Sequence, residues 1–206
     1  KYLQRIREIC DEFGALLIYD EIQTYCRIGE FFAAQYYDVE PDIIVLGKAL
    51  GGGLPIAAVI IRDGLKGFEM QGEELHTFAN NSVSQVAALK QIEIIERDNL
   101  LQNTRDMGAY LAEKLRTLQA KFPQIGDVRQ VGLHIGVEMV HPEDNTPLSP
   151  QQAMRIRSVA MDKGLILGTA GYMKNLLKIK PPLIINRAEC DEVIAIFSDT
   201  LAEVFA

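Results

Sequence analysis

The chain of 206 residues is long enough for one large or two small domains. Its formal net charge of −7 argues against nucleic acids and anionic membranes as partners, and no apolar run approaches the length that spans a bilayer. Three scattered cysteines (Cys10, Cys26 and Cys190) predict neither a disulfide framework nor a metal site, and they favour a reducing, cytoplasmic compartment.

The first half of the chain alternates between helical and strand patterns. An amphipathic helix is predicted over residues 1–13, with Gly14 where helices commonly end, and a short helix is predicted over residues 30–37. Three continuous apolar runs suit strands that are buried on both faces of a parallel sheet. These runs predict strands over residues 15–19, 43–47 and 56–61.

The second half predicts a smaller α+β arrangement. Pro123 ends a long helix because proline cannot continue one, and Ser149 with Pro150 forms a typical N-cap and first-turn pair. Helices are predicted over residues 82–96, 99–122, 151–163 and 188–204. Strands are predicted over residues 133–140 and 176–179, with a further short strand beginning at residues 165–167.

Two of the apolar runs in the first half end in charged residues, Asp20 and Lys48. Ligands of open α/β sheets bind at the carboxyl ends of the strands, so we expect this acid and this amine to meet at one site. A buried lysine can act as a nucleophilic amine that forms Schiff bases with carbonyl compounds. A carboxylate across a bound ring keeps a pyridine nitrogen protonated, and this pair of groups is typical of pyridoxal phosphate enzymes.

Several motifs occur in a specific order along the chain. They are Asp20-Glu21-Ile22-Gln23, Pro41-Asp42-Ile43 before Lys48, Gly51-Gly52-Gly53-Leu54-Pro55, His76-Thr77-Phe78 and Lys180-Pro181-Pro182-Leu183. Each alone has an ordinary structural explanation, such as a helix cap, a solvated lysine or a flexible loop. Together they resemble the class III pyridoxal-phosphate-dependent aminotransferases, the ornithine, acetylornithine and 4-aminobutyrate type, over essentially the whole chain.

This resemblance implies the α/β architecture of fold type I pyridoxal phosphate enzymes. Residues 1–105 would form the second half of the large three-layer domain, with its mainly parallel sheet. Residues 106–206 would form the small α+β C-terminal domain. Because the family carries a phosphate-binding half upstream, we also expect this chain to be the C-terminal part of a longer protein.

The resemblance also implies roles for individual residues. Lys48 would hold pyridoxal 5'-phosphate as an internal aldimine and move the proton, and Asp20 would pair with the ring nitrogen. Ile22 would pack against one face of the ring, which is compatible with plain core packing. Gln23 would contact the ring hydroxyl. Thr77 would bind the cofactor phosphate of the neighbouring subunit, which implies a homodimer with shared active sites.

Two departures from the family pattern leave the substrate open. The loop at residues 24–29 is one residue shorter than usual and has Tyr25 and Cys26 where the family has glycines. Lys178 stands where many members have an arginine that clamps the substrate carboxylate. Lys178 could bind a carboxylate or phosphate of a changed substrate, or be a solvated lysine in an enzyme whose amine lacks an α-carboxylate.

Transamination between an amine or amino acid and a keto acid is therefore the first hypothesis. A pyridoxal phosphate lyase or racemase is the second, because some lyases that act on phosphate-bearing amines are similar around the Lys-x-Lys-Pro-Pro segment. The third is a non-catalytic relative, motivated by the altered loop and by Asn80 and Asn81, which depart from the family pattern. The retained Lys48 and Asp20 argue against this third hypothesis, since a binding scaffold needs neither.

Overall fold

The computed structural model describes residues 1–65, 79 and 81–206. The chain divides into two compact units, Lys1–Leu101 and Gln102–Ala206, which are described separately. Thr77, a predicted phosphate-binding residue, lies outside the described residues. The assignment of the two units to a large and a small catalytic domain stays a prediction.

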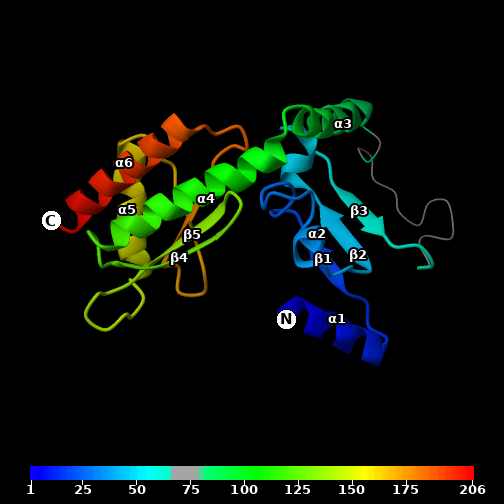
Figure 1. Ribbon diagram of the computed structural model, residues 1–206, viewed down its shortest axis with the longest axis horizontal. Helices are drawn as coiled ribbons and strands as arrows, with labels where there is room; N and C mark the ends of the chain where they lie inside the picture. The colour runs from blue at the N-terminus through cyan, green and yellow to red at the C-terminus, as the bar shows by residue number, and fades with distance from the viewer. Residues whose placement is uncertain (66–78, 80) are drawn as a thin grey trace. The chain divides into compact units, whose positions relative to one another are not determined.

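The first unit is built around a small mixed sheet (Figure 1). Strand β1 (Ile18–Asp20) pairs in parallel with β2 (Ile43–Leu46), and β2 pairs antiparallel with β3 (Ala58–Ile61). The remaining elements are helices α1 (Tyr2–Phe13), α2 (Ala33–Tyr37) and α3 (Ser82–Arg97), and the 3₁₀ turn η1 (Lys48–Gly51). Helix α1 ends as predicted, because Gly14 adopts the left-handed conformation (φ 65°) that glycine tolerates best.

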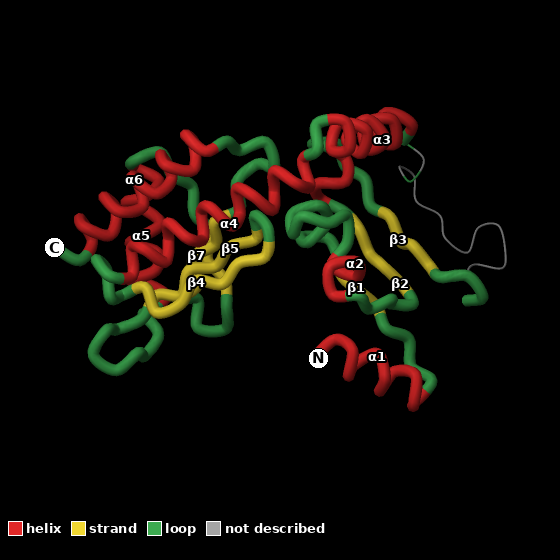
Figure 2. The backbone as a smooth tube through the Cα atoms, viewed as in Figure 1, coloured by secondary structure: helices red, strands yellow, loops and turns green. Residues whose placement is uncertain are grey.

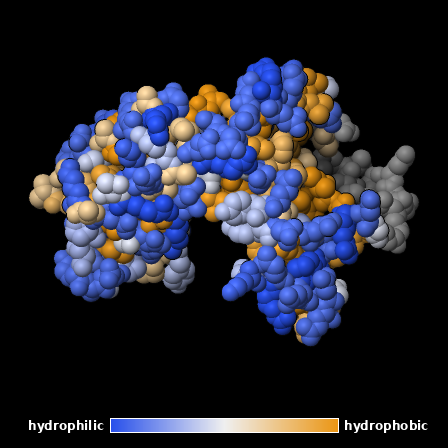
Figure 3. Space-filling model, viewed as in Figure 1, coloured by the Kyte–Doolittle hydropathy of each residue, from blue (hydrophilic) through white to orange (hydrophobic). Residues whose placement is uncertain are grey.

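The prediction that these strands are buried on both faces is wrong for β1 and β3. The side chain of Ile18 is 55% exposed and that of Val59 is 62% exposed. Within the described part of the chain, no strand pairs with the outer edge of β1 or of β3. Apolar residues consequently gather on the surface between α1 and α3, where Figure 3 shows them in orange.

A buried carboxylate, that of Asp42, links the strands at the end of the sheet where β1 and β2 begin. Asp42, which is 1% exposed, directly precedes β2 and accepts a hydrogen bond from the backbone N–H of Leu17 (2.6 Å). It also forms ion pairs of 2.8 Å with Arg7 of α1 and with Arg62 after β3. These contacts lower the pKa of Asp42, the Leu17 bond most strongly and the Arg7 bond next. Asp42 thus links α1, β1, β2 and β3 at the end of the sheet where β1 and β2 begin.

The second unit is a four-stranded antiparallel sheet with helices against one face (Figure 2). The strand order is β4-β5-β7-β6, formed by β4 (Ile125–Val131), β5 (His134–Met139), β6 (Gly168–Ala170) and β7 (Leu176–Ile179). Helices α4 (Leu100–Gln119), α5 (Pro150–Asp162) and α6 (Arg187–Val204) complete the unit. The core contains fully buried side chains from all three helices and from the strands: Leu111, Leu115, Ile135, Val137, Ile156, Leu177, Phe197 and Leu201.

Most of the second unit agrees with the sequence pattern. Strand β7 has its predicted bounds, and Ser149 caps α5 by accepting a hydrogen bond from the backbone N–H of Gln152. Strand β4 was not predicted, because its exposed side carries polar residues such as Asp127 and Arg129. Strand β6 begins at Gly168 rather than at residues 165–167. Leu167 precedes this strand but still packs into the core, where it is only 3% exposed.

Candidate active site

Asp20 and Lys48 lie at the carboxyl ends of the neighbouring parallel strands β1 and β2. Asp20 is the last residue of β1 and pairs in register with Val45 of β2. The backbone N–H of Glu21 extends this pairing by donating to the Val45 carbonyl (3.0 Å). Lys48 follows two residues after the end of β2, and both charged side chains are exposed. The topology therefore creates the ligand position that parallel strands favour.

The turn after β1 fixes the carboxylate of Asp20 and brings Ile22 towards the second strand end. Asp20 Oδ1 accepts a hydrogen bond from the backbone N–H of Ile22 (3.0 Å), which is the geometry of an Asx turn. A Cβ atom added at Gly47 would lie 3.7 Å from Cγ1 of Ile22, so Ile22 packs directly against the residue that precedes Lys48. Asp20, Ile22 and Lys48 therefore lie at the same end of the sheet.

The backbone at Lys48 adopts an unusual conformation. Gly47 is extended, and Lys48 then has φ of +45°, a left-handed value that is uncommon for residues other than glycine. The 3₁₀ turn η1 follows, and Gly52 and Gly53 also have positive φ (58° and 113°). Residues that keep such strain cluster at functional sites, where the surrounding structure holds them in place. Here α3 packs against η1, with Gln91 in contact with the turn at Gly52.

Glu21 supports the site from within, a role that the sequence pattern did not predict. Its side chain is 1% exposed, and Oε1 accepts a hydrogen bond from the backbone N–H of Ala34 at the start of α2 (3.1 Å). Its other oxygen accepts from the hydroxyl of Thr24. No sequence signal separates this buried acid from its exposed neighbour Asp20, because both directly follow the same apolar run.

The shortened loop after Gln23 folds into a compact aromatic cluster. The ring of Tyr25 lies 6.2 Å from Phe31 and 6.0 Å from Phe32, and both phenylalanines precede α2 rather than belonging to it as predicted. Cys26 takes a left-handed φ of 58° and is 1% exposed, and burial raises the pKa of its thiol to about 12. Tyr25 and Cys26 are both buried, so their side chains are accommodated at the positions where the family resemblance predicts glycines.

Lys178 lies in the second unit, in the middle of β7. It pairs in register with Gly136 of β5 on one side and with Gly168 of β6 on the other. Its side chain is on the sheet face opposite the core, since its neighbours Leu177 and Ile179 are buried. Among the described residues, no carboxylate forms an ion pair with its amine.

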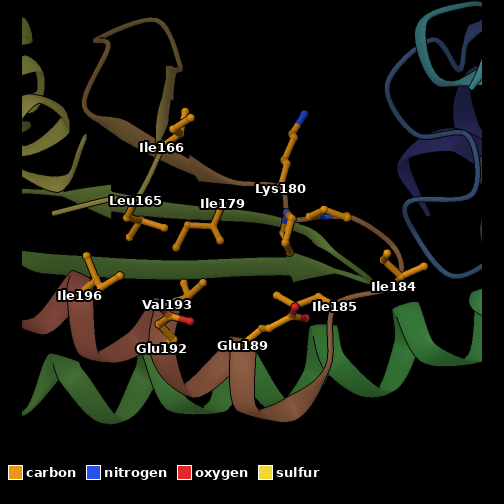
Figure 4. Close-up of a pocket in the computed structure, with 13 residues that line it drawn as sticks. Leu165, Ile166, Ile179, Lys180, Ile184, Ile185, Glu189, Glu192, Val193 and Ile196 are labelled. Atoms are coloured by element: carbon orange, nitrogen blue, oxygen red, sulfur yellow. The ribbon is translucent and has the colours of Figure 1, made fainter. Parts of the chain in front are cut away.

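A cavity of about 540 Å³ lies within the second unit, mostly between apolar side chains. In Figure 4 the side chains of Leu165, Ile179 and Val193 gather inside it, while Lys180 extends away from α6. None of the predicted site residues lines this cavity. Its lining is mostly apolar and also includes the charged residues Lys180, Glu189 and Glu192.

The comparisons with known proteins identify the family. The model of the family "Aminotransferase class-III" matches residues 1–201. The chain belongs to the class III aminotransferase family. A diaminobutyrate–2-oxoglutarate aminotransferase of Rhizobium meliloti is 37% identical to this class III chain, over 100% of the chain and 44% of that protein.

Two further matches show the range of this family. A (R)-1-hydroxy-2-aminoethylphosphonate ammonia-lyase of Vibrio splendidus is 35% identical over 98% of the chain and 42% of that protein. The crystal structure of a Bacillus anthracis aminotransferase superposes with a TM-score of 0.90 and 32% identity, covering 98% of the chain and 48% of that structure. This confirms the predicted α/β fold of pyridoxal phosphate transaminases. The chain spans about half the length of the curated relatives it matches.

Pyridoxal phosphate is the cofactor of this family, and the chain's residues fit it. Asp20 and Lys48 offer an acid and an amine at one end of the sheet, and the Ile22 side chain packed on Gly47 offers an apolar surface beside them. Within the described ranges, no cluster of three or more His, Cys, Asp or Glu side chains could hold a metal ion. No helix in the same ranges is long and apolar enough to cross a membrane.

Proposed function

We propose that the protein carrying this chain transfers an amino group from an amine or amino acid to a keto acid, with Lys48 as the lysine that binds pyridoxal phosphate. One observation supports this most strongly. In a member of the class III family, an acid and a backbone-strained lysine lie at the carboxyl ends of adjacent parallel strands. A structural pair would be expected to form an ion pair or lie in a core, and this pair does neither.

The proposed roles follow from the chemistry of each group. Bound pyridoxal phosphate supplies an electrophilic aldehyde and a ring that draws electrons from the substrate carbon. Lys48 would hold the cofactor through Nζ and would move a proton to and from the substrate carbon as general base and acid. Asp20 keeps the ring nitrogen protonated, because its carboxylate favours the charged form of that nitrogen.

The neighbouring residues position the ring in this proposal. Ile22 would pack against one ring face and Gln23 would contact the ring hydroxyl. Thr77 binds the phosphate in a neighbouring subunit, so the active form is a homodimer with shared sites. Exposed apolar residues on α3, which follows the Thr77 segment, support a partner-covered face. The three free cysteines support a reducing, cytoplasmic location.

Lys178 is proposed to bind the substrate. Its position matches that of the carboxylate-binding arginine in many family members, and it carries a charge that no described carboxylate neutralises. The lysine ammonium is a compact point charge, unlike the planar fork of the arginine guanidinium, so it can bind carboxylate and phosphate groups alike. The activities of two relatives fit this proposal, because diaminobutyrate and an aminoethylphosphonate each carry an anionic group as well as an amine.

Elimination is the second candidate, favoured by the relative that is an ammonia-lyase. A lyase releases ammonia without needing a keto acid acceptor, and a racemase leaves the amine in place, so product analysis separates all three reactions. A non-catalytic relative would bind the cofactor but convert no amine in a broad panel of amino acids, diamines and phosphorylated amines.

The test is a donor–acceptor screen with the natural full-length polypeptide and its Lys48→Ala, Asp20→Asn and Lys174→Ala variants. Lys174 is the matched control, since it is another exposed lysine with a left-handed φ (61°). We expect Lys48→Ala to abolish turnover and Asp20→Asn to lower kcat by roughly a hundredfold or more, while Lys174→Ala has no effect. Full turnover by Lys48→Ala would disprove the proposal.

A further inference from the structure

Lys178 has an unusual setting in its sheet. The two residues directly opposite it, Gly136 and Gly168, both lack side chains. Cross-strand side-chain pairs are the main source of stability within a sheet, and glycine inside a strand weakens it. The sheet therefore lacks cross-strand side-chain pairs on both sides of Lys178, and this leaves space beside the lysine.

The two glycines use this space differently. A Cβ atom added at Gly168 would lie 2.8 Å from Cε and 3.6 Å from Nζ of Lys178, so the lysine lies directly across Gly168. A Cβ atom added at Gly136 would instead meet the methyl groups of Leu176 at 3.1 and 3.2 Å. Of the two glycines, Gly168 is therefore the one that lies beside the amine of Lys178.

The other charges on this sheet face leave the amine available. Glu138 of β5, an acid on the same sheet face, is paired with Arg129 of β4 at 2.7 Å. Lys178 itself forms no ion pair within the described part of the chain. The ammonium of a half-buried lysine that has no protein anion as partner can take its counter-charge from a ligand.

We propose that Gly168 is a positioning residue, which by lacking a side chain seats Lys178 for the anionic group, a carboxylate or a phosphate-type group, of the amine substrate. This inference rests on the proposed function of the site. A methyl group at residue 168 would push the flexible end of Lys178 aside at little cost in stability, because the atoms it meets can move. The Nζ amine of Lys178 would then no longer reach the anionic group of the substrate.

The first experiment compares Gly168→Ala with the matched control Gly136→Ala in the natural full-length polypeptide. For an anion-bearing donor, we expect Gly168→Ala to raise KM roughly tenfold with little change in kcat, as loss of one charge-assisted hydrogen bond predicts. KM for a neutral monoamine should not change. Gly136→Ala should leave both unchanged, and adding Gly168→Ala to Lys178→Ala should raise KM no further. A further rise in that double variant would overturn the inference.

The second experiment reads Lys178 directly and does not depend on turnover. Lysines are labelled by reductive ¹³C-methylation, which keeps their charge, and the signal of Lys178 is assigned as the one missing from Lys178→Arg. We expect titration with inorganic phosphate and with acetate to shift this signal in the wild-type protein and in Gly136→Ala, but not in Gly168→Ala. The relative size of the two shifts distinguishes phosphate from carboxylate.

The outcomes separate the two proposals. An anion-dependent shift that Gly168→Ala removes, in a protein without turnover, would retain the positioning role and refute the proposed reaction. Turnover by Lys48 with an identical shift in wild-type protein and Gly168→Ala would refute the positioning role alone. A wild-type signal that does not respond to either anion would also refute it.

Discussion

Gly108 of α4 is the position where the structure predicts the largest effect from one added methyl group. A Cβ atom there would lie 2.0 Å from the carbonyl oxygen of Gly132 and 2.4 Å from its carbonyl carbon. Gly132 forms the turn between β4 and β5, with φ of 54°. Because the obstacle is backbone on both sides, no side-chain rotation relieves the clash, and the helix must move away from the sheet that carries Lys178.

The magnitude follows from two opposing terms. Overpacking costs roughly 1–3 kcal/mol, and a backbone clash belongs at or above the upper end of that range. Replacing glycine by alanine inside a helix returns about 1 kcal/mol of helix propensity. Gly108→Ala should therefore lower the free energy of unfolding by about 2 kcal/mol or more.

Urea unfolding followed by circular dichroism measures this change. The control is Ala109→Gly, at the exposed neighbouring position of the same helix, which should cost about 1 kcal/mol through propensity alone. Propensity by itself would make Gly108→Ala stabilising and Ala109→Gly destabilising. A Gly108→Ala protein as stable as the wild type would refute the close contact of α4 with the β4–β5 turn.

Three further predictions concern other parts of the chain. Because the pKa of Asp42 is lowered, its contribution to the free energy of unfolding is present above the unfolded pKa of about 4 and is lost as the pH falls through the folded pKa. The difference in stability between wild type and Asp42→Asn should therefore narrow on acidification. A difference that is constant with pH would contradict this. Burial raises the pKa of Cys26 to about 12 and that of Cys190 to about 11, so a thiol reagent at pH 8 should label Cys10 alone until denaturant is added, and native labelling of Cys26 would contradict the packed loop. Leu89→Lys on the exposed face of α3 should dissociate the proposed homodimer in sedimentation analysis, and an unchanged dimer would remove α3 from the interface.

The sequence pattern located most elements of the fold because their apolar periodicity is strong. The helix ending at Gly14 and strand β7 agree with the prediction. The exposure of Ile18 and Val59 could not be predicted, because an apolar run indicates burial without saying which chain segment covers it. Strand β4 was missed because its polar outward residues weaken the signal of an edge strand.

The candidate site was only partly predictable. The two apolar runs indicated that Asp20 and Lys48 share one end of the sheet, and the parallel register of β1 and β2 agrees with this. The left-handed backbone of Lys48 and the buried carboxylate of Glu21 depend on tertiary contacts that no local pattern encodes. The space over Gly168 likewise follows only from strand register, which pairs residues ten positions apart.

The central claim, that Lys48 is the residue that carries pyridoxal phosphate, can be tested by one measurement. The purified full-length polypeptide is reduced with borohydride, which fixes the cofactor to its lysine, and the digested peptides are analysed by mass spectrometry. We expect a single pyridoxyl adduct on the peptide that contains Lys48, and its loss in Lys48→Ala. An adduct on a different lysine, or cofactor-loaded protein with no adduct at all, would contradict the account.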